Sequence, residues 1–327
     1  MKISKKIIVF SIMTASFVSN AQTTETKSTP NEMVDALHGT FGKHPHARAV
    51  HAKGIITEGY FEAAKEAKKI TKAVQFQNKK TPITVRFSDF TGIPTIPDTV
   101  GVSNPRGLAI KFHLPNGTSS DIVTHSFNGF PTANTDEFIK LLGAIAQSGA
   151  NAPKPTALEK FFETHPIAKT FLTTQKPPST SFGTLSYFGV NSYKFTNAKD
   201  ESKFIRYQFI PEDGEKFLSK EQLSKSGPDY LYEEIKAHLV AKPIKFKLYA
   251  QIAVSGDAIA DPSIVWPDSR ERVLLGTITI TKIGNNDLEA DKQLRFIPNN
   301  LTDGIGTADP MLEDRSKAYP VSQKERQ

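Results

Sequence analysis

The segments TPITVRFSDF (81–90) and DTVGVSNPRGLAIKFHLPNG (98–117) decide how this chain folds. In the first segment, a period of two places three apolar side chains on one face of a strand and the polar side chains of Arg86 and Ser88 on the other. Residues that favour turns, mainly Pro, Gly and Asn, separate this run from the next one. The two segments therefore predict successive strands at Ile83–Ser88 and Leu108–Phe112.

The same kinds of pattern continue along the rest of the chain. Further strands are predicted at Asp121–His125, Phe204–Ile210, Ile244–Val254 and Val273–Ile283. Apolar residues at helical spacing predict helices at Gly59–Asn78, within 135–175 and at Asp229–Ala241. Six strands without regular βαβ alternation indicate an α+β fold, an antiparallel β-barrel core with surrounding helices.

Cysteine is absent from the 327 residues, whereas phenylalanine is abundant at 22. The lack of Cys excludes disulfides, zinc-thiolate sites, iron–sulfur clusters and a cysteine nucleophile. A metal in this protein must therefore be held by His, carboxylate or Tyr side chains, or by a prosthetic group.

The N-terminus has the layout of a secretory signal. Three Lys residues precede an apolar run from Ile7 to Val18, and small residues follow at Ser19 and Ala21. The run is shorter than the roughly twenty residues that a membrane span needs, so no stable membrane insertion is expected. We predict a signal peptide at 1–21, a disordered leader at 22–32, and one domain at 33–327. Export implies the periplasm where the host has an outer membrane.

The net charge of +7 comes from Lys and Arg residues that are scattered among acidic ones. Such a pattern is typical of a solvated basic surface and not of a block that binds phosphates. No nucleic-acid partner is expected.

Three segments hold the candidate chemistry. In HPHARAVHAKG (44–54), Arg48 precedes His51 by three residues, and small residues flank both. The three histidines of this segment could instead be ordinary loop residues, or His44 and His46 could bind a metal.

On the strand, Arg86 beside Ser88 is either a solvent-facing cation or a buried one paired with a carboxylate. Near the C-terminus, DPMLEDRSKAY spaces Arg315 and Tyr319 four residues apart, on one face of a helix. A guanidinium next to a phenol stabilises the phenolate, the form that binds ferric iron.

These segments, in this order, resemble the haem catalase family. RAVHAKG resembles its distal-histidine segment, the two opening segments with DIV resemble its barrel core, and RSKAYP resembles its proximal-tyrosine signature. LSYFGVNSYKFTN and DPSIVWPD also match in order, so the resemblance covers most of residues 33–326.

The resemblance implies a role for each matching position. His51 is similar to the distal acid–base histidine, Ser88 to its orienting partner, and Tyr319 to the axial iron ligand with Arg315 beside it. Five further positions match residues that hold the haem, the first three by pairing with its propionates: Arg48, Arg86, Arg326, Val50 and Phe138.

The chain departs from the family pattern in two ways. Catalases carry an asparagine on the distal side where the aligned position here is His125, and a gap in the alignment could bring Asn128 there instead. The chain also stops just past the tyrosine motif, as in the minimal catalase-related peroxidases.

The implied function is that of a haem-dependent peroxidase. It would reduce organic peroxides, and to some extent hydrogen peroxide, with electrons from a small reductant and with weak catalase activity alongside. The cofactor would be haem b with its iron bound by Tyr319. The alternative is an exported haem-binding protein without useful turnover. The physiological peroxide, the reductant and the choice between a monomer and a homo-oligomer stay open.

Overall fold

The structure is a computed structural model that describes residues 27–77, 80–174 and 176–327. The predicted signal peptide at 1–21 lies outside these residues, as does the first part of the predicted leader, 22–26. The prediction that the leader extends to residue 32 is wrong, because helix α1 (Pro30–Phe41) begins at Pro30. Thr29 and Glu32 form a capping box that satisfies two backbone N–H groups at this helix start, so the ordered chain begins before residue 33.

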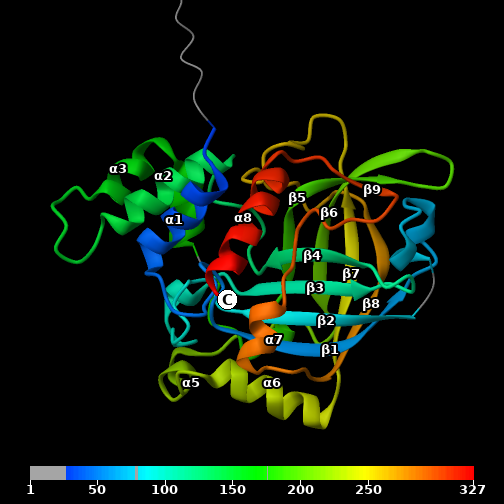
Figure 1. Ribbon diagram of the computed structural model, residues 1–327, viewed down its shortest axis with the longest axis horizontal. Helices are drawn as coiled ribbons and strands as arrows, with labels where there is room; N and C mark the ends of the chain where they lie inside the picture. The colour runs from blue at the N-terminus through cyan, green and yellow to red at the C-terminus, as the bar shows by residue number, and fades with distance from the viewer. Residues whose placement is uncertain (1–26, 78–79, 175) are drawn as a thin grey trace, which may run out of the picture.

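The core is an antiparallel barrel of eight strands (Figure 1). Hydrogen-bonded neighbours follow the order β4-β3-β2-β1-β8-β7-β6-β5, and pairing of His125 with Phe188 joins β4 to β5 and closes the barrel. The strands are β1 (Gly54–Ala63), β2 (Lys80–Ser88), β3 (Gly107–His113), β4 (Ser119–His125), β5 (Tyr187–Thr196), β6 (Ser202–Pro211), β7 (Ile244–Ile252) and β8 (Arg272–Ile283), with a short β9 (Ile305–Thr307) beside β5.

The inside of the barrel is filled by apolar side chains, many of them aromatic. On β2, Ile83, Val85 and Phe87 are at most 2 % exposed and point inward, as the alternation predicts. Phe87 stacks on Phe182 with ring centroids 5.3 Å apart. Many of the phenylalanines therefore pack inside the barrel. The polar residues of β2 face outward.

Helices cover the outside of the barrel. Besides α1, they are α2 (Thr135–Ala146), α3 (Ala157–Thr164), α4 (Pro166–Thr173), α5 (Lys220–Ser224), α6 (Tyr230–Ala241), α7 (Leu288–Gln293) and α8 (Met311–Glu325). Helix α1 packs against α2 and α8, and α8 (red in Figure 1) lies between α1 and the barrel. This arrangement leaves the outer face of β2–β4 beneath α8.

The predicted helix at Gly59–Asn78 is wrong. Residues up to Ala63 belong to β1, and 3₁₀ turns at Ala67–Lys69 and Val74–Phe76 follow. Pairing with β2 and β8 overrides the local helical preference, because it buries Phe61 completely inside the barrel. Gly59 permits this pairing, since a Cβ atom there would lie 2.0 Å from the Thr279 carbonyl oxygen of β8.

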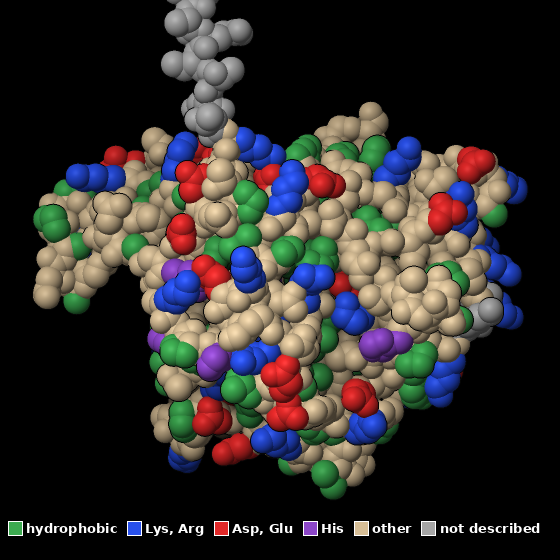
Figure 2. All heavy atoms as spheres, in the orientation of Figure 1, with side chains coloured by type: hydrophobic (Ala, Val, Ile, Leu, Met, Phe, Trp, Pro, Cys, Tyr) green, Lys and Arg blue, Asp and Glu red, His purple; other side chains and the backbone are tan. Residues whose placement is uncertain are grey.

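The other predicted elements are present, with two refinements. The region 135–175 contains the three helices α2, α3 and α4, and β5 was not predicted as a strand. Among the described residues, no helix is long and apolar enough to cross a membrane. On the face shown in Figure 2, charged side chains of both signs are scattered over the surface, as the sequence predicts.

Candidate active site

A cavity lies between the outer face of the barrel and helices α1 and α8. About 810 Å³ of empty space lies within and at the mouth of this cavity, open solvent included. Apolar side chains of α1, of residues 49–50 and of the strands form most of its wall. Its polar side chains include six that the sequence singles out, Arg48, His51, Arg86, Ser88, Tyr319 and Arg326, together with Thr124, Arg295 and Ser322.

His51 is held by the chain just beyond the end of β2. Its φ of 57° lies in the left-handed region, which non-glycine residues rarely adopt. The backbone N–H of His51 donates to the Phe90 carbonyl at 2.9 Å, which fixes the main chain there. The ring Nδ1 then lies 3.0 Å from the Asp89 carbonyl oxygen and 3.0 Å from Ser88 Oγ. Ser88 thus contacts the histidine ring as the sequence predicts.

These contacts select the tautomer of His51. A carbonyl oxygen can only accept a hydrogen bond, so Nδ1 carries the proton and Nε2 keeps its lone pair. Burial, reinforced by the positive charge of Arg86, lowers the pKa of His51 to about 3. The ring is therefore a neutral base at physiological pH, with Nε2 free to take up a proton.

One row of residues runs across β2, β3 and β4 beside this imidazole. Ser88 pairs with Gly107, and Gly107 pairs with His125, so all three face the same side of the sheet. A Cβ atom at Gly107 would lie 2.5 Å from Ser88 Oγ and 2.8 Å from Nδ1 of His51. Glycine is therefore required at this point of the row to leave room for the histidine.

His125 lies at the end of this row with the opposite tautomer to His51. The Phe127 N–H donates to Nδ1 of His125 at 3.3 Å, so the ring proton of His125 is on Nε2. That Nε2 atom is buried and has no hydrogen-bond partner among the described residues. Burial, with His51 nearby, lowers the pKa of His125 to about 3. Asn128 lies in the loop after β4, whereas His125 lies on the same side of the sheet as Ser88 and Gly107. His125 is not among the described residues that line the cavity.

Tyr319 lines the cavity from α8 and is held through a relay of polar side chains. Its hydroxyl accepts a hydrogen bond from Arg315 Nη2 at 2.7 Å, one helical turn away. Arg315 Nη1 donates to Asn191 Oδ1 at 2.5 Å, and Asn191 Nδ2 donates to Asp309 Oδ2 at 2.7 Å. Burial lowers the pKa of Arg315, but its interactions, led by that with Tyr319, raise the pKa above its ordinary value. Arg315 therefore stays charged beside the phenol oxygen.

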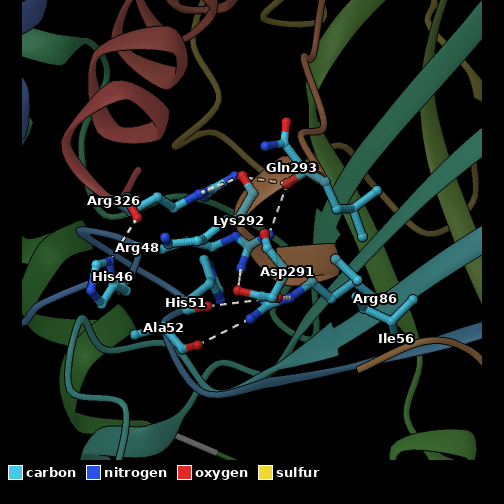
Figure 3. Close-up of polar contacts among 12 residues, drawn as sticks. His46, Arg48, His51, Ala52, Ile56, Arg86, Asp291, Lys292, Gln293 and Arg326 are labelled. Carbon is cyan, nitrogen blue, oxygen red and sulfur yellow. Dashed lines mark hydrogen bonds and ion pairs between the residues drawn. The ribbon is translucent and has the colours of Figure 1, made fainter. Parts of the chain in front are cut away.

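The three arginines predicted to pair with propionates all line the cavity. They lie close together around Asp291 and Lys292 (Figure 3). Each contacts the segment 291–294, which includes the end of α7. Arg48 and Arg86 both pair with the carboxylate of Asp291. Arg326, at the end of α8, donates to the Leu294 carbonyl at 2.8 Å. The arginine on β2 is thus buried and paired, not exposed to solvent.

The two apolar predictions have different outcomes. Val50 lines the cavity next to His51. Phe138 is not among the described residues that form the wall, and it packs instead on Phe130 with centroids 5.0 Å apart. Phe138 belongs to a small apolar cluster that joins α1, α2 and α8, so its contribution is to hold those helices together.

The alternative metal site at His44 and His46 finds no support in the geometry. His44 Nε2 lies 3.1 Å from the Phe41 carbonyl, and His46 Nδ1 lies 3.3 Å from the carbonyl of Arg326. In the described part of the chain, no group of three or more His, Asp or Glu side chains could hold a metal ion.

The residues that are present fit a haem. The cavity wall is mainly apolar, as a porphyrin face requires, and Tyr319 supplies an oxygen donor suited to ferric iron. The arginine cluster already binds one carboxylate, that of Asp291, which is the chemistry that a propionate would need. The buried Nε2 of His125 adds a donor that has no partner among the described residues.

Sequence reasoning missed three residues of this site. Asn191 lies within LSYFGVNSYKFTN, a segment that resembles the family, so the resemblance is the signal that could have found it. Asp309 and Asp291 carry no local signal, because their partners are far away in the sequence. Asp309 binds Asn191, 118 residues away, and Asp291 binds Arg86, 205 residues away.

Comparison with known proteins agrees with this geometry. The catalase family profile matches residues 35–327. The chain is similar in fold to a fungal catalase, with a TM-score of 0.77 at 22 % identity, covering 87 % of this chain and 60 % of that one. Yeast catalase A gives a TM-score of 0.76 at 21 % identity over 87 % and 62 % of the two chains. The chain thus spans about three fifths of these solved catalases.

Two curated relatives match over nearly their whole length. A catalase-related peroxidase of Synechococcus elongatus is 33 % identical over 91 % of this chain and 88 % of its own. A catalase-related peroxidase of Mycolicibacterium paratuberculosis is 32 % identical over 90 % and 94 %, respectively. The chain therefore belongs to the catalase family and is of its minimal, catalase-related peroxidase type.

Proposed function

We propose that this oxidoreductase reduces organic peroxides, and more slowly hydrogen peroxide, with electrons from a small-molecule donor. The cofactor is haem b, with Tyr319 as the iron ligand and Arg48, Arg86 and Arg326 at its propionates. The observation that carries the proposal is the neutral His51, whose Nε2 is kept unprotonated in the same cavity as a phenol held by Arg315.

The chain's own residues move one proton and hold the peroxide. Nε2 of His51 takes the proton of the peroxide hydroxyl and returns it to the oxygen that leaves as water or an alcohol. Ser88 and the Asp89 carbonyl keep the ring in orientation throughout, because both contact Nδ1. When bound, the haem supplies the redox chemistry that accepts the peroxide oxygen and receives the donor's electrons.

His125 is the second distal group in this proposal. Its Nε2–H is a hydrogen-bond donor without a partner in the described part of the chain, so it can donate to the peroxide oxygen that His51 is not protonating. The two histidines thereby divide the work, one as a base and the other as a donor. An imidazole is bulkier and stiffer than an amide, which favours peroxidase turnover over the tightly constrained second peroxide of a catalase cycle.

The proposal extends to location. The Lys residues, the apolar run and the small residues within 1–21 support export. An exported enzyme would act on peroxides outside the cytoplasm. The N-terminal sequence of the protein purified from fractionated cells tests this. A mature chain that starts after Ala21 is expected, and a chain that retains Met1 in the cytoplasmic fraction would exclude export.

An absorption spectrum of the purified, haem-supplemented protein tests the proposed function. We expect a Soret band, and oxidation of an electron-donating dye after an alkyl hydroperoxide is added. His51→Ala should keep the Soret band and lose about 10²–10⁴-fold in dye oxidation, the usual worth of acid–base catalysis. Tyr319→Phe should lose the wild-type spectrum, because it removes the oxygen donor.

Three results would refute parts of this assignment. A wild-type protein without a Soret band would exclude haem binding. A Soret band without dye oxidation would indicate a haem-binding protein that lacks turnover. Full activity in His51→Ala would remove His51 from the acid–base role.

A further inference from the structure

Asp291 bridges two arginines of the cavity wall, Arg48 and Arg86. Its Oδ1 accepts a hydrogen bond from Arg86 Nε at 3.1 Å, and its Oδ2 pairs with Arg48 Nη1. Figure 3 shows the carboxylate between the two guanidinium groups. Burial alone would raise the pKa of Asp291, but Arg86 and Arg48 lower it, so the group is ionised and both contacts are ion pairs.

The backbone around Asp291 holds the same cluster. Arg48 Nη2 donates to the carbonyls of Asp291 and Leu294 at 3.0 and 2.9 Å. Arg326 donates to the carbonyls of Lys292 and Leu294 at 3.2 and 2.8 Å. The segment 291–294 therefore anchors donors of all three guanidinium groups.

Asp291 lies outside the cavity, although Leu294 of the same segment is part of the cavity wall. Arg48, Arg86 and Arg326 line the cavity wall, and Asp291 is not among the described residues that line it. Asp291 keeps 25 % of its side chain exposed, compared with 4 % for Arg86, so the carboxylate holds the arginines from the outer side. Arg48 Nε and Arg326 Nη1 donate to no described residue, which leaves donors for a ligand in the cavity.

We propose that Asp291 is a positioning residue for the haem propionates: it holds Arg48 and Arg86 in place behind the cavity wall. This inference rests on the proposed function. Without the carboxylate, two like charges would face each other at close range with no bridging anion, and the guanidinium groups would lose their fixed orientation. Haem would then be held less firmly at its propionate end, although Tyr319 and the apolar wall would be unchanged.

The rate of haem loss from the loaded protein to excess apomyoglobin tests this role. We expect Asp291→Asn to lose haem about tenfold faster or more, as removal of outer supporting residues commonly does at metal sites. Asp291→Glu keeps the charge, so its rate of haem loss should lie closer to that of the wild type than to that of Asp291→Asn. Glu289→Gln on the same helix is the matched control, since Glu289 accepts from Gln293 and touches none of the three arginines.

A second ligand separates positioning from a general loss of structure. Haem dimethyl ester has no propionate charge, so wild type and Asp291→Asn should release it at the same rate. Equal or slower loss of ordinary haem from Asp291→Asn would overturn the proposal, as would equal acceleration by Glu289→Gln or with the ester. If the wild type itself binds no haem, the proposed function fails and this inference fails with it, an outcome distinct from the others.

Discussion

At the residue scale, the site depends on two histidines with opposite tautomers. Nδ1 of His51 donates to a backbone carbonyl, whereas Nδ1 of His125 accepts from a backbone N–H. The same side chain therefore serves as an acceptor at one position and as a donor at the other. The tautomer of each ring is determined by the backbone group that contacts its Nδ1, and not by the chemistry of the imidazole alone.

Substitution of His125 tests its role as a donor. His125→Phe keeps a ring but removes the N–H, and we expect kcat/KM for an alkyl hydroperoxide to fall about tenfold, the worth of one good hydrogen bond. His125→Asn keeps an N–H donor and should retain most of the activity. Steady-state dye oxidation measures both. Equal activity of His125→Phe and wild type would show that the Nε2–H does not contact the peroxide.

Residue types could be predicted at this scale, but their protonation could not. As the sequence motifs predict, Ser88 contacts His51, and Arg315 contacts Tyr319. Phe138 was expected at the cavity wall and packs between helices instead. A motif specifies a residue's place in the chain order, whereas the direction of its side chain depends on the elements packed around it.

At the element scale, three neighbouring strands build the floor of the site. The row Ser88, Gly107 and His125 exists only because β2, β3 and β4 pair in one register. A shift of one residue would turn every side chain of a strand to the other face. The site therefore requires a residue without a side chain at position 107, because any Cβ atom there would displace the imidazole of His51.

Addition of one methyl group at Gly107 should disturb the site. In Gly107→Ala the new Cβ would lie 2.5 Å from Ser88 Oγ and 2.8 Å from Nδ1 of His51, so the imidazole must shift. We expect at least a tenfold loss of dye oxidation, because small misplacements of catalytic groups cost large factors. Gly101→Ala is the control, as a Cβ there meets nothing within 4 Å. Loss of the far-UV circular dichroism signal would instead indicate misfolding.

Strands with strict alternation were predictable, and β1 was not. Residues 83–88 alternate cleanly between apolar and polar, and they lie in β2. Residues 59–63 belong to an Ala- and Glu-rich stretch that favours a helix, yet they pair with β2 and β8. Local preference decides an element only where the rest of the fold does not impose another pairing.

At the scale of the whole molecule, buried titratable groups link stability to pH. The pKa values of His51 and His125 are lowered to about 3 in the folded chain, from the ordinary 6.5. Between pH 6.5 and 3 the unfolded chain therefore binds more protons at these sites, and stability falls as the pH falls. Asp89 acts in the opposite direction, since burial raises its pKa to about 7 from 3.8.

His125→Asn should make the protein less sensitive to acid. Urea unfolding of the haem-free chain at pH 6.5 and 4.5 gives the stability lost on acidification. We expect the variant to lose about 1–3 kcal/mol less than wild type, because one of the two histidines no longer takes up a proton on unfolding. Identical losses in the two proteins would show that His125 is charged in the folded state.

The sequence alone determined the barrel class, the order of the motifs and the chemical types at the site. These features are local: alternation, helical spacing and short segments depend on near neighbours in the chain. Only the tertiary structure decided the features that need distant segments to meet. It placed Asp291 behind Arg86, 205 residues away, joined Asn191 to Arg315, and set the two histidine tautomers through backbone groups. Such contacts form when the barrel closes, and they have no counterpart in the spacing of residues along the chain.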